Sequence, residues 1–196
     1  MIRTKQDLKE YLKRDLGVYI TPFHRIFKSI DMWLRGTETI PAWNTLYALR
    51  HYEYYLNNKE RLSAIQKCIM QYWRFKFRHC QLRYNIHIEP NVIGPGVTIM
   101  HPGYRKIPSF VEIGENCTIL PMVLIGRKKP TAKGKAIIGN NCYISTGVTI
   151  LSPVRIGNNV TIGAGAVVTK DIPDNQTVAG VPASPISLFR HSSGQD

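Results

Sequence analysis

IGNNCYISTGVTILSPVRIGNNVTIGAGAVVTKDIP, residues 138–173, divides without remainder into six units of six residues. The first place of each unit is Ile or Val, and the fifth place is a small or apolar residue. This period matches neither the 3.6-residue period of a helix nor the alternation of a simple strand. The first places are Ile138, Ile144, Ile150, Ile156, Ile162 and Val168, and the fifth places are Cys142, Val148, Val154, Val160, Ala166 and Ile172.

A short fixed period predicts a solenoid. Six residues suffice for one flat side of a three-sided coil, made of a short strand and a turn. The first-place side chain would then point inward and stack on its equivalent one coil, or 18 residues, later. The same phase appears upstream at residues 113–126 and 93–104, so we expect the coil to occupy about residues 86–183.

Two stretches break the period: PGYRKIPSF at residues 102–110 and RKKPTAKGKAI at residues 127–137. We expect both to loop out of the prism. A long loop in an otherwise regular solenoid usually has a functional reason.

The first part of the chain has a helical pattern. Apolar residues at helical spacing predict helices at about 4–17, capped by Thr4 and ended by Gly17, and at 22–36, 41–56 and 59–82. We therefore divide the chain into a helical region at 1–84, a β-helix domain at 85–186 and a tail at 187–196.

Charge and composition narrow the class of protein. The chain has 26 Lys and Arg against 13 Asp and Glu, a net charge of +13, which suits phosphate-bearing ligands, nucleic acids or anionic membranes. No apolar run reaches membrane-spanning length and the first residues are charged, so we expect a cytoplasmic protein. The four cysteines form no CxxC pair and are interpreted as reduced core residues, without a metal.

The helix expected at 59–82 contains WRFKFRHCQLRY at residues 73–84. One interpretation is an amphipathic basic helix that lies on a membrane or binds nucleic acid. The other is a helix that faces the core or an interface, with Lys and Arg side chains that reach out to water. No nucleic-acid-binding motif accompanies it, so we expect no nucleic-acid partner and keep peripheral membrane contact as the alternative.

The chain resembles the hexapeptide-repeat acyltransferases. IGAGAVVTKDIPDNQTVAGVPAS at residues 162–184 is similar to the terminal coil of acetyl-CoA-dependent O-acetyltransferases. The helical region, IGPGVTIMHPG at 93–103 and EIGENCTILPMVLIG at 112–126 resemble the serine acetyltransferase-like branch, which includes capsular and exopolysaccharide enzymes. The resemblance implies a left-handed parallel β-helix, a homotrimer with active sites between neighbouring prisms, and acetyl-CoA as co-substrate.

The same resemblance implies that His101 is the general base, because an imidazole with a pKa near 6.5 can take the proton of an attacking hydroxyl. The Asp that orients this base in the family is absent. The matching stretch is His87-Ile88-Glu89-Pro90, so Glu89 or Asn85 is the candidate replacement, and His87 is a candidate for acceptor contact. A plain turn role is the competing interpretation for all three.

The cofactor side is better preserved. By resemblance, the backbone groups of Thr146 and Ala164 would bind the pantetheine arm, and adjacent glycines would allow its close approach. Thr169 and Lys170 match a Thr-Lys pair near the CoA phosphates, and Gly180 belongs to the segment beside the adenine. The full set of cofactor-binding candidates is Thr146, Gly147, Ala164, Gly165, Thr169, Lys170 and Gly180.

The acceptor is the weakest part of the resemblance. Serine acetyltransferases carry Asp-Arg-His-Pro-Lys in the second loop, whereas this chain has Lys133-Gly134-Lys135-Ala136-Ile137. We therefore expect an O-acetyltransferase that acts on a sugar hydroxyl of a surface or capsular polysaccharide precursor. The alternatives are a serine O-acetyltransferase of cysteine biosynthesis, an N-acetyltransferase of an amino sugar, an inactive hexapeptide scaffold and a γ-carbonic-anhydrase-like metal protein.

Overall fold

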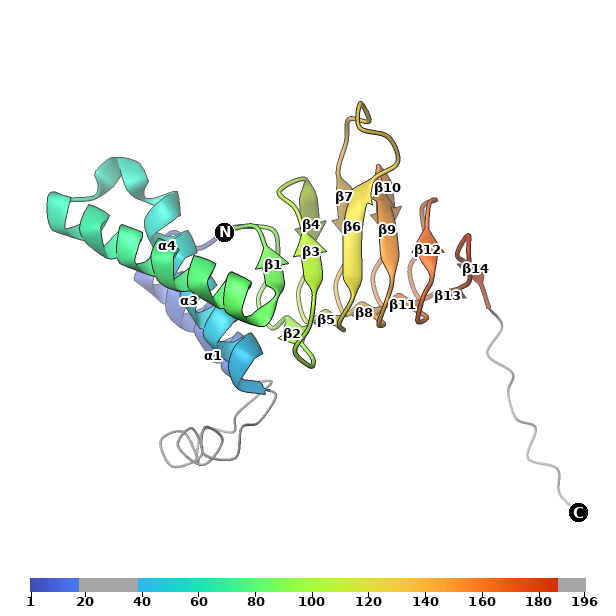
Figure 1. Cartoon of the computed structure of the whole chain (residues 1–196), viewed down its shortest axis with the longest axis horizontal. Helices are drawn as coiled ribbons and strands as arrows, with labels where there is room; N and C mark the ends of the chain where they lie inside the picture. Colours follow the sequence, from blue (N-terminus) through green and yellow to red (C-terminus); the bar gives the residue numbers. More distant parts are fainter. Residues whose placement is uncertain (18–38, 187–196) are drawn as a thin grey trace, which may run out of the picture.

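The computed structural model describes residues 1–17 and 39–186. The helix expected at 22–36 falls outside these residues, and so does the tail at 187–196. The described helices are α1 (Lys5–Gly17), α3 (Thr39–Asn57), the short 3-10 helix η2 (Lys59–Arg61) and α4 (Ala64–Tyr84). They gather at one end of an elongated prism of strands (Figure 1).

The prism is a left-handed parallel β-helix, as the six-residue period and the family resemblance predict. Its three walls, named here sheets A, B and C, have the strand orders β1-β3-β6-β9-β12, β10-β7-β4 and β14-β13-β11-β8-β5-β2. The pairings between these strands are parallel, except that of β13 with β14. The strands are β1 (Ile86–Ile88), β2 (Thr98–Ile99), β3 (Arg105–Ile107), β4 (Val111–Ile113), β5 (Thr118–Ile119), β6 (Val123–Arg127), β7 (Ala136–Ile138), β8 (Tyr143–Ile144), β9 (Thr149–Ser152), β10 (Val154–Ile156), β11 (Thr161–Ile162), β12 (Val167–Val168), β13 (Thr177–Ala179) and β14 (Ser184–Pro185).

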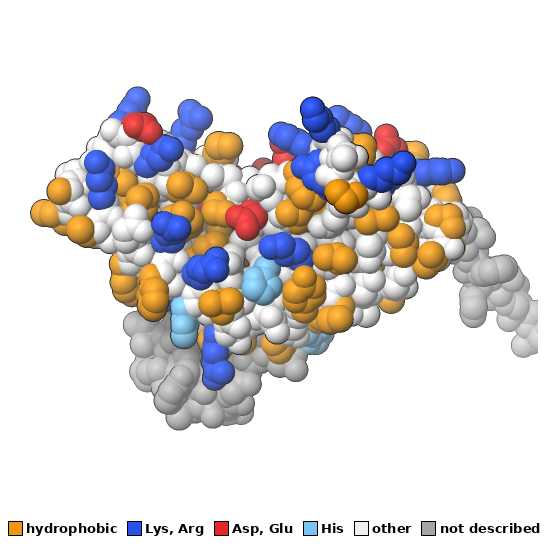
Figure 2. Space-filling view, turned by 45° about the horizontal axis from the view of Figure 1, so that its top comes forward, with side chains coloured by type: hydrophobic (Ala, Val, Ile, Leu, Met, Phe, Trp, Pro, Cys, Tyr) orange, Lys and Arg blue, Asp and Glu red, His pale blue; other side chains and the backbone are white. Residues whose placement is uncertain are grey.

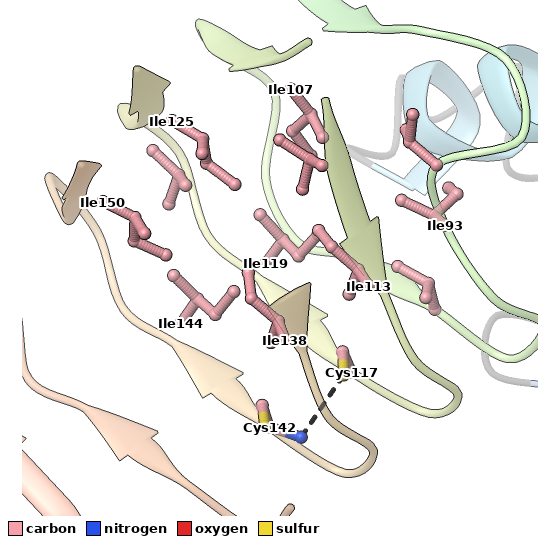
Figure 3. Close-up of a cluster of buried hydrophobic side chains, with 14 of the residues drawn as sticks. Ile93, Ile107, Ile113, Cys117, Ile119, Ile125, Ile138, Cys142, Ile144 and Ile150 are labelled. Carbon is pink, nitrogen blue, oxygen red and sulfur yellow. Dashed lines mark hydrogen bonds between the residues drawn. The ribbon is translucent and has the colours of Figure 1, made fainter. Parts of the chain in front are cut away.

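The register follows the repeat. Ile144 pairs with Ile162, which is 162 − 144 = 18 residues later, so equivalent first-place side chains stack along the axis. Each first-place residue of residues 138–173 is buried, and the fifth-place residues fill the remaining space beside them. Figure 3 shows Ile138, Ile144 and Ile150 stacked with upstream Ile side chains between the walls, with Cys117 and Cys142 at one corner. The core is therefore a narrow column of branched side chains that gives every coil the same cross-section.

The two breaks in the period differ from what we expected. Only the start of the first break leaves the prism, because its residues 105–107 form β3 inside sheet A. In the second break, Arg127 still belongs to β6 and Ala136 begins β7, so the excursion is limited to residues 128–135. This excursion is the long loop that projects from the prism in Figure 1.

Capping interactions fix the helix starts. The Thr4 hydroxyl accepts a hydrogen bond from the Asp7 backbone N–H at 3.0 Å, which confirms the predicted cap of α1. Ser63 and Gln66 form a capping box at the start of α4. This cap divides the single helix expected at 59–82 into η2 and α4. Cys68 lies exposed on α4, so the expectation that all four cysteines are core residues is wrong there.

A buried ion cluster joins the helices to the first coil. Arg50 is fully buried and its guanidinium bonds Asp15 at 2.8 Å and Glu53 at 3.0 Å. The same guanidinium donates to the carbonyls of Ile93 and Gly94 at 3.0 and 2.6 Å. These contacts cap the open end of the prism with charge-assisted hydrogen bonds.

None of the helices in the described ranges is long and apolar enough to cross a membrane.

Candidate active site

The corner where the chain passes from sheet C to sheet A carries the candidate base and much of the candidate cofactor set. We call it the C–A edge; it comprises residues 100–104, 120–122, 145–148, 163–166 and 180–182. The strand register aligns Ile99, Ile119, Ile144, Ile162 and Val178 on successive coils. The residues two places later are therefore equivalent, and they are His101, Pro121, Thr146, Ala164 and Gly180.

This alignment places four of the predicted site residues in one row. Neighbouring strands lie about 4.8 Å apart, so Thr146 is roughly 10 Å, Ala164 roughly 14 Å and Gly180 roughly 19 Å along the edge from His101. The chemistry predicted for these residues needs such a row, because an extended thioester must bring its reactive end to the base while its far end is held elsewhere.

Backbone conformation keeps this edge open. Gly147 and Gly165 have φ of +72° and +69°, in the left-handed region where glycine carries no penalty. A Cβ on Gly165 would meet nothing within 4 Å, so packing within the chain does not require a glycine there. The Gly165 N–H bonds the Thr146 carbonyl at 2.9 Å, which holds consecutive coils together. From Thr146 to Gly165 the edge thus presents small side chains and accessible backbone.

His101 shares the left-handed conformation, with a φ of 56°, and its side chain is exposed. Arg105, which is fully buried, ties this turn together. Its guanidinium donates to the carbonyls of Met100, of His101 at 2.7 Å and of Gly103 at 3.0 Å. Arg105 therefore holds the backbone on both sides of the imidazole-bearing residue.

Sequence reasoning missed Arg105, which it counted only as part of a loop. No sequence signal marked it, because it lies where the six-residue period fails and its burial is visible only in β3 of the folded chain.

Asn85 and Glu89, the candidate partners of His101, lie on either side of β1, and only Asn85 lies at the start of sheet A. The Asn85 carbonyl accepts from the Arg105 backbone N–H at 3.0 Å, next to the C–A edge. Glu89 follows the far end of β1, roughly 10 Å along the strand from that edge, and is exposed. The structure therefore brings Asn85, and not Glu89, toward the turn that carries His101.

His87 lies between these two positions. Its ring centroid is 6.0 Å from that of Tyr104, a C–A edge residue, and its Cα partner in the sheet is Lys106. Partial burial, followed by the nearby charges of Lys106 and Arg78, lowers the pKa of His87 from its usual value. A neutral imidazole beside this edge can accept or donate a hydrogen bond to a bound acceptor.

Thr169 and Lys170 are not on the C–A edge. They follow β12 at its opposite end, where Thr169 is half-buried and Lys170 is exposed. Gly180 is connected to the start of that strand, because its carbonyl accepts from the Val167 N–H at 3.0 Å. The last strand of sheet A thus separates the Gly180 segment from the Thr-Lys pair by roughly 7–10 Å.

The second loop is cationic and exposed. Arg127 packs over the Phe110 ring at 4.3 Å and bonds the Ala132 carbonyl, while Lys135 pairs with Glu112. Lys133 is exposed. Blue side chains gather over this part of the molecule in Figure 2. Among the residues that the structure describes, no three His, Cys, Asp or Glu side chains gather as a metal site.

Comparison with known proteins finds transferases that are similar to this chain. Residues 135–170 match the family described as bacterial transferase hexapeptide (six repeats). A serine acetyltransferase of Synechococcus elongatus is 33% identical over 167 residues, which are 82% of this chain and 64% of the relative. These matches confirm the resemblance to the serine acetyltransferase-like hexapeptide proteins.

Solved structures give the same fold. Soybean serine acetyltransferase aligns with a TM-score of 0.70 and 24% identity, over 93% of this chain and 70% of the soybean chain. The serine acetyltransferase of Brucella abortus, solved in complex with coenzyme A, aligns with a TM-score of 0.68 and 22% identity, over 93% and 69% of the two chains.

These comparisons correct the expected acceptor. The curated relatives are named serine acetyltransferases, so the preference for a sugar of a polysaccharide precursor is wrong and the alternative, serine, is favoured. That preference relied on the missing Arg and His of one loop, but this loop retains exposed cations that can meet a carboxylate. The chain spans 60% to 64% of the length of the first two curated relatives.

Proposed function

We propose that this chain, a hexapeptide-repeat protein similar to serine acetyltransferases, transfers the acetyl group of acetyl-CoA to the hydroxyl of L-serine. One observation carries the proposal: His101 shares a single edge of the prism with Thr146, Ala164 and Gly180. The names of the curated relatives support serine as the acceptor.

His101 acts as the general base. Its imidazole removes the proton from the serine hydroxyl while that oxygen bonds to the thioester carbonyl carbon. The C–S bond of the tetrahedral intermediate then breaks, and the sulfur leaves with the proton carried by the imidazolium. The products are O-acetylserine and free CoA. Arg105 supports this step indirectly, because it fixes the carbonyls of Met100 and His101.

The rest of the C–A edge binds the acetyl-CoA. The pantetheine arm runs along the row from Gly180 to His101, where Gly147 and Gly165 leave the backbone accessible. Lys170, together with Thr169, lies at the far end of β12 and meets the phosphates as a point charge. The Brucella abortus relative solved with coenzyme A supports this choice of ligand.

The functional unit is a homotrimer. Large apolar side chains are exposed around the first coils of the C–A edge, namely those of Met100, Tyr104, Met122, Leu124 and Tyr143. A neighbouring prism that covers them would bury apolar area and supply the second wall of the site. In that arrangement, cations of the second loop, such as Lys133, would lie beside the carboxylate of the bound serine.

The test is CoA release from acetyl-CoA with a panel of acceptors. We expect saturable release with L-serine, and only background thioester hydrolysis with L-alanine, which lacks the hydroxyl. Mass spectrometry of the product would identify O-acetylserine. Absence of release with L-serine at any concentration, from a chain that is folded by circular dichroism, would refute the proposal and leave the inactive scaffold as the explanation.

A further inference from the structure

We propose that the outward face of α4 is a docking surface for an anionic membrane. The face consists of Ile65, Tyr72, Phe75 and Leu82, with the flanking cations Lys67, Arg74, Arg78 and Arg83. This proposal does not depend on the proposed function, because the C–A edge contains no residue of α4.

Large apolar side chains on this face are exposed to an unusual degree. The exposed fractions are 75% for Ile65, 56% for Tyr72, 73% for Phe75 and 63% for Leu82. Their spacings of seven, three and seven residues place them along one side of a helix. The inward side is occupied by Phe77 and Cys80, which are buried. The helix therefore has apolar side chains on two sides: one side packs in the core, and the other is exposed to water.

The charges of α4 all have one sign. Its Lys and Arg residues are not accompanied by any Asp or Glu over its 21 residues. Four of these cations flank the apolar side chains, whereas Lys76 lies over the Trp73 ring at 5.1 Å. Gln71, Arg74, Phe75, Arg78, His79 and Leu82 line a shallow concavity there. In Figure 2, orange and blue side chains alternate over this end of the molecule, with few red ones.

Exposed apolar side chains together with cations and no carboxylates favour some partners for this face over others. A second copy would bring the same cations against each other, and the helix offers no carboxylate to neutralise them. A nucleic acid would pair the cations but leave the aliphatic Ile65 and Leu82 without a suitable surface. An anionic bilayer accepts both, since its head groups attract Lys and Arg while Phe and Leu side chains enter the acyl boundary.

The orientation of α4 suits such a contact. The helix packs on α3 and ends where β1 begins, and the Gln81 side chain bonds the Ile88 carbonyl at 2.6 Å. Docking would therefore occur through the helical end, with the prism projecting away from it (Figure 1). The C–A edge would stay in the aqueous phase.

Vesicle sedimentation of the whole chain tests the proposal. We expect binding to phosphatidylcholine vesicles that contain about 30% phosphatidylglycerol, and at least roughly tenfold weaker binding to pure phosphatidylcholine. Raising the salt from about 0.1 M to about 0.5 M should release most of the bound protein.

Three double variants locate the surface. Phe75→Gln with Leu82→Gln should lower the partition constant about tenfold, and so should Arg74→Gln with Arg78→Gln. The matched control, Lys128→Gln with Lys129→Gln, removes the same charge from the second loop and should bind like the unaltered chain. All are surface changes, so circular dichroism should be unchanged.

Three outcomes would overturn the proposal. One is equal binding to neutral and anionic vesicles. Another is unchanged binding of the Phe75→Gln, Leu82→Gln variant. The third is the absence of vesicle binding together with a loss of oligomer size in that variant by light scattering, which would identify a second copy as the partner.

Discussion

Two edges of the same prism need a left-handed backbone conformation at their corners, and they use different residues to adopt it. The B–C edge, where the chain passes from sheet B to sheet C, comprises residues 94–97, 114–117, 139–142, 157–160 and 173–176. Four of its left-handed positions carry Asn, namely Asn116, Asn141, Asn159 and Asn175, with φ of 55–60°, and the equivalent position of the first coil is Gly96. The C–A edge has Gly147 and Gly165 at comparable angles. The choice of residue, and not the backbone, distinguishes the edges.

On the B–C edge the side-chain amides bond one another from coil to coil. The Asn159 amide donates to Asn175 at 2.9 Å and its oxygen accepts from Asn141 at 3.2 Å, so the side chains form a ladder along the axis. At Gly147 and Gly165 on the C–A edge the corresponding side chain is only a hydrogen atom, which leaves backbone groups for a ligand. A repeat that needs φ > 0 thus separates a structural edge, closed by Asn, from a candidate binding edge, opened by Gly.

The largest expected effect is catalytic and belongs to the C–A edge. His101→Ala should lower kcat/KM for acetyl transfer about 10²- to 10⁴-fold, the range for loss of a general base. Asn159→Gly on the B–C edge is the control, since it keeps the left-handed backbone and touches no candidate site residue. If both variants retained full activity in a CoA-release assay, the functional difference between the edges would disappear.

Arg105→Met should affect the same edge indirectly, because Arg105 holds the turn that positions His101. The change leaves three carbonyls of the His101 turn without their buried donor, and we expect a loss of about 3 kcal/mol in unfolding free energy. Activity should fall through kcat, with the KM for acetyl-CoA little changed, measured well below the unfolding temperature.

Arg105→Lys, which keeps the charge but not the planar fork, should recover only part of the activity. An unfolding loss without any change in kcat would show that Arg105 supports only the fold.

The contrast between the edges explains which features the sequence could predict. Ile at every sixth place predicts the prism, and the 18-residue coil then aligns Thr146 with Ala164 from the sequence alone. Arg105 was beyond prediction because it lies where the period fails, so its inward direction depends on three carbonyls that only the folded turn assembles. Glu89 shows a similar limit, because it is close to His87 in the sequence but follows the end of β1 that is far from the C–A edge.

A smaller effect is expected on the B–C edge, and it concerns stability. Asn159→Ala removes two amide contacts and puts an ordinary residue at a φ of 55°, which together should cost about 2 kcal/mol. Asn159→Gly should cost about 1 kcal/mol, because only the hydrogen bonds are lost. Urea unfolding measures both, and equal losses would mean that the left-handed conformation is not what Asn provides.

The last comparison concerns two glycines that the sequence alone does not distinguish. Gly165→Ala should raise the KM for acetyl-CoA about tenfold, and its left-handed φ should cost about 1 kcal/mol of stability, since its Cβ meets nothing within the chain. Gly139→Ala, on the B–C edge, would place a Cβ 2.7 Å from Gly157 backbone atoms, so it should lose about 1–3 kcal/mol of stability by overpacking and leave KM unchanged. Steady-state kinetics together with urea unfolding distinguish the two. If Gly139→Ala were stable and had a raised KM, the ligand would bind at the B–C edge. If Gly165→Ala raises KM and Gly139→Ala lowers only stability, the ligand binds at the C–A edge.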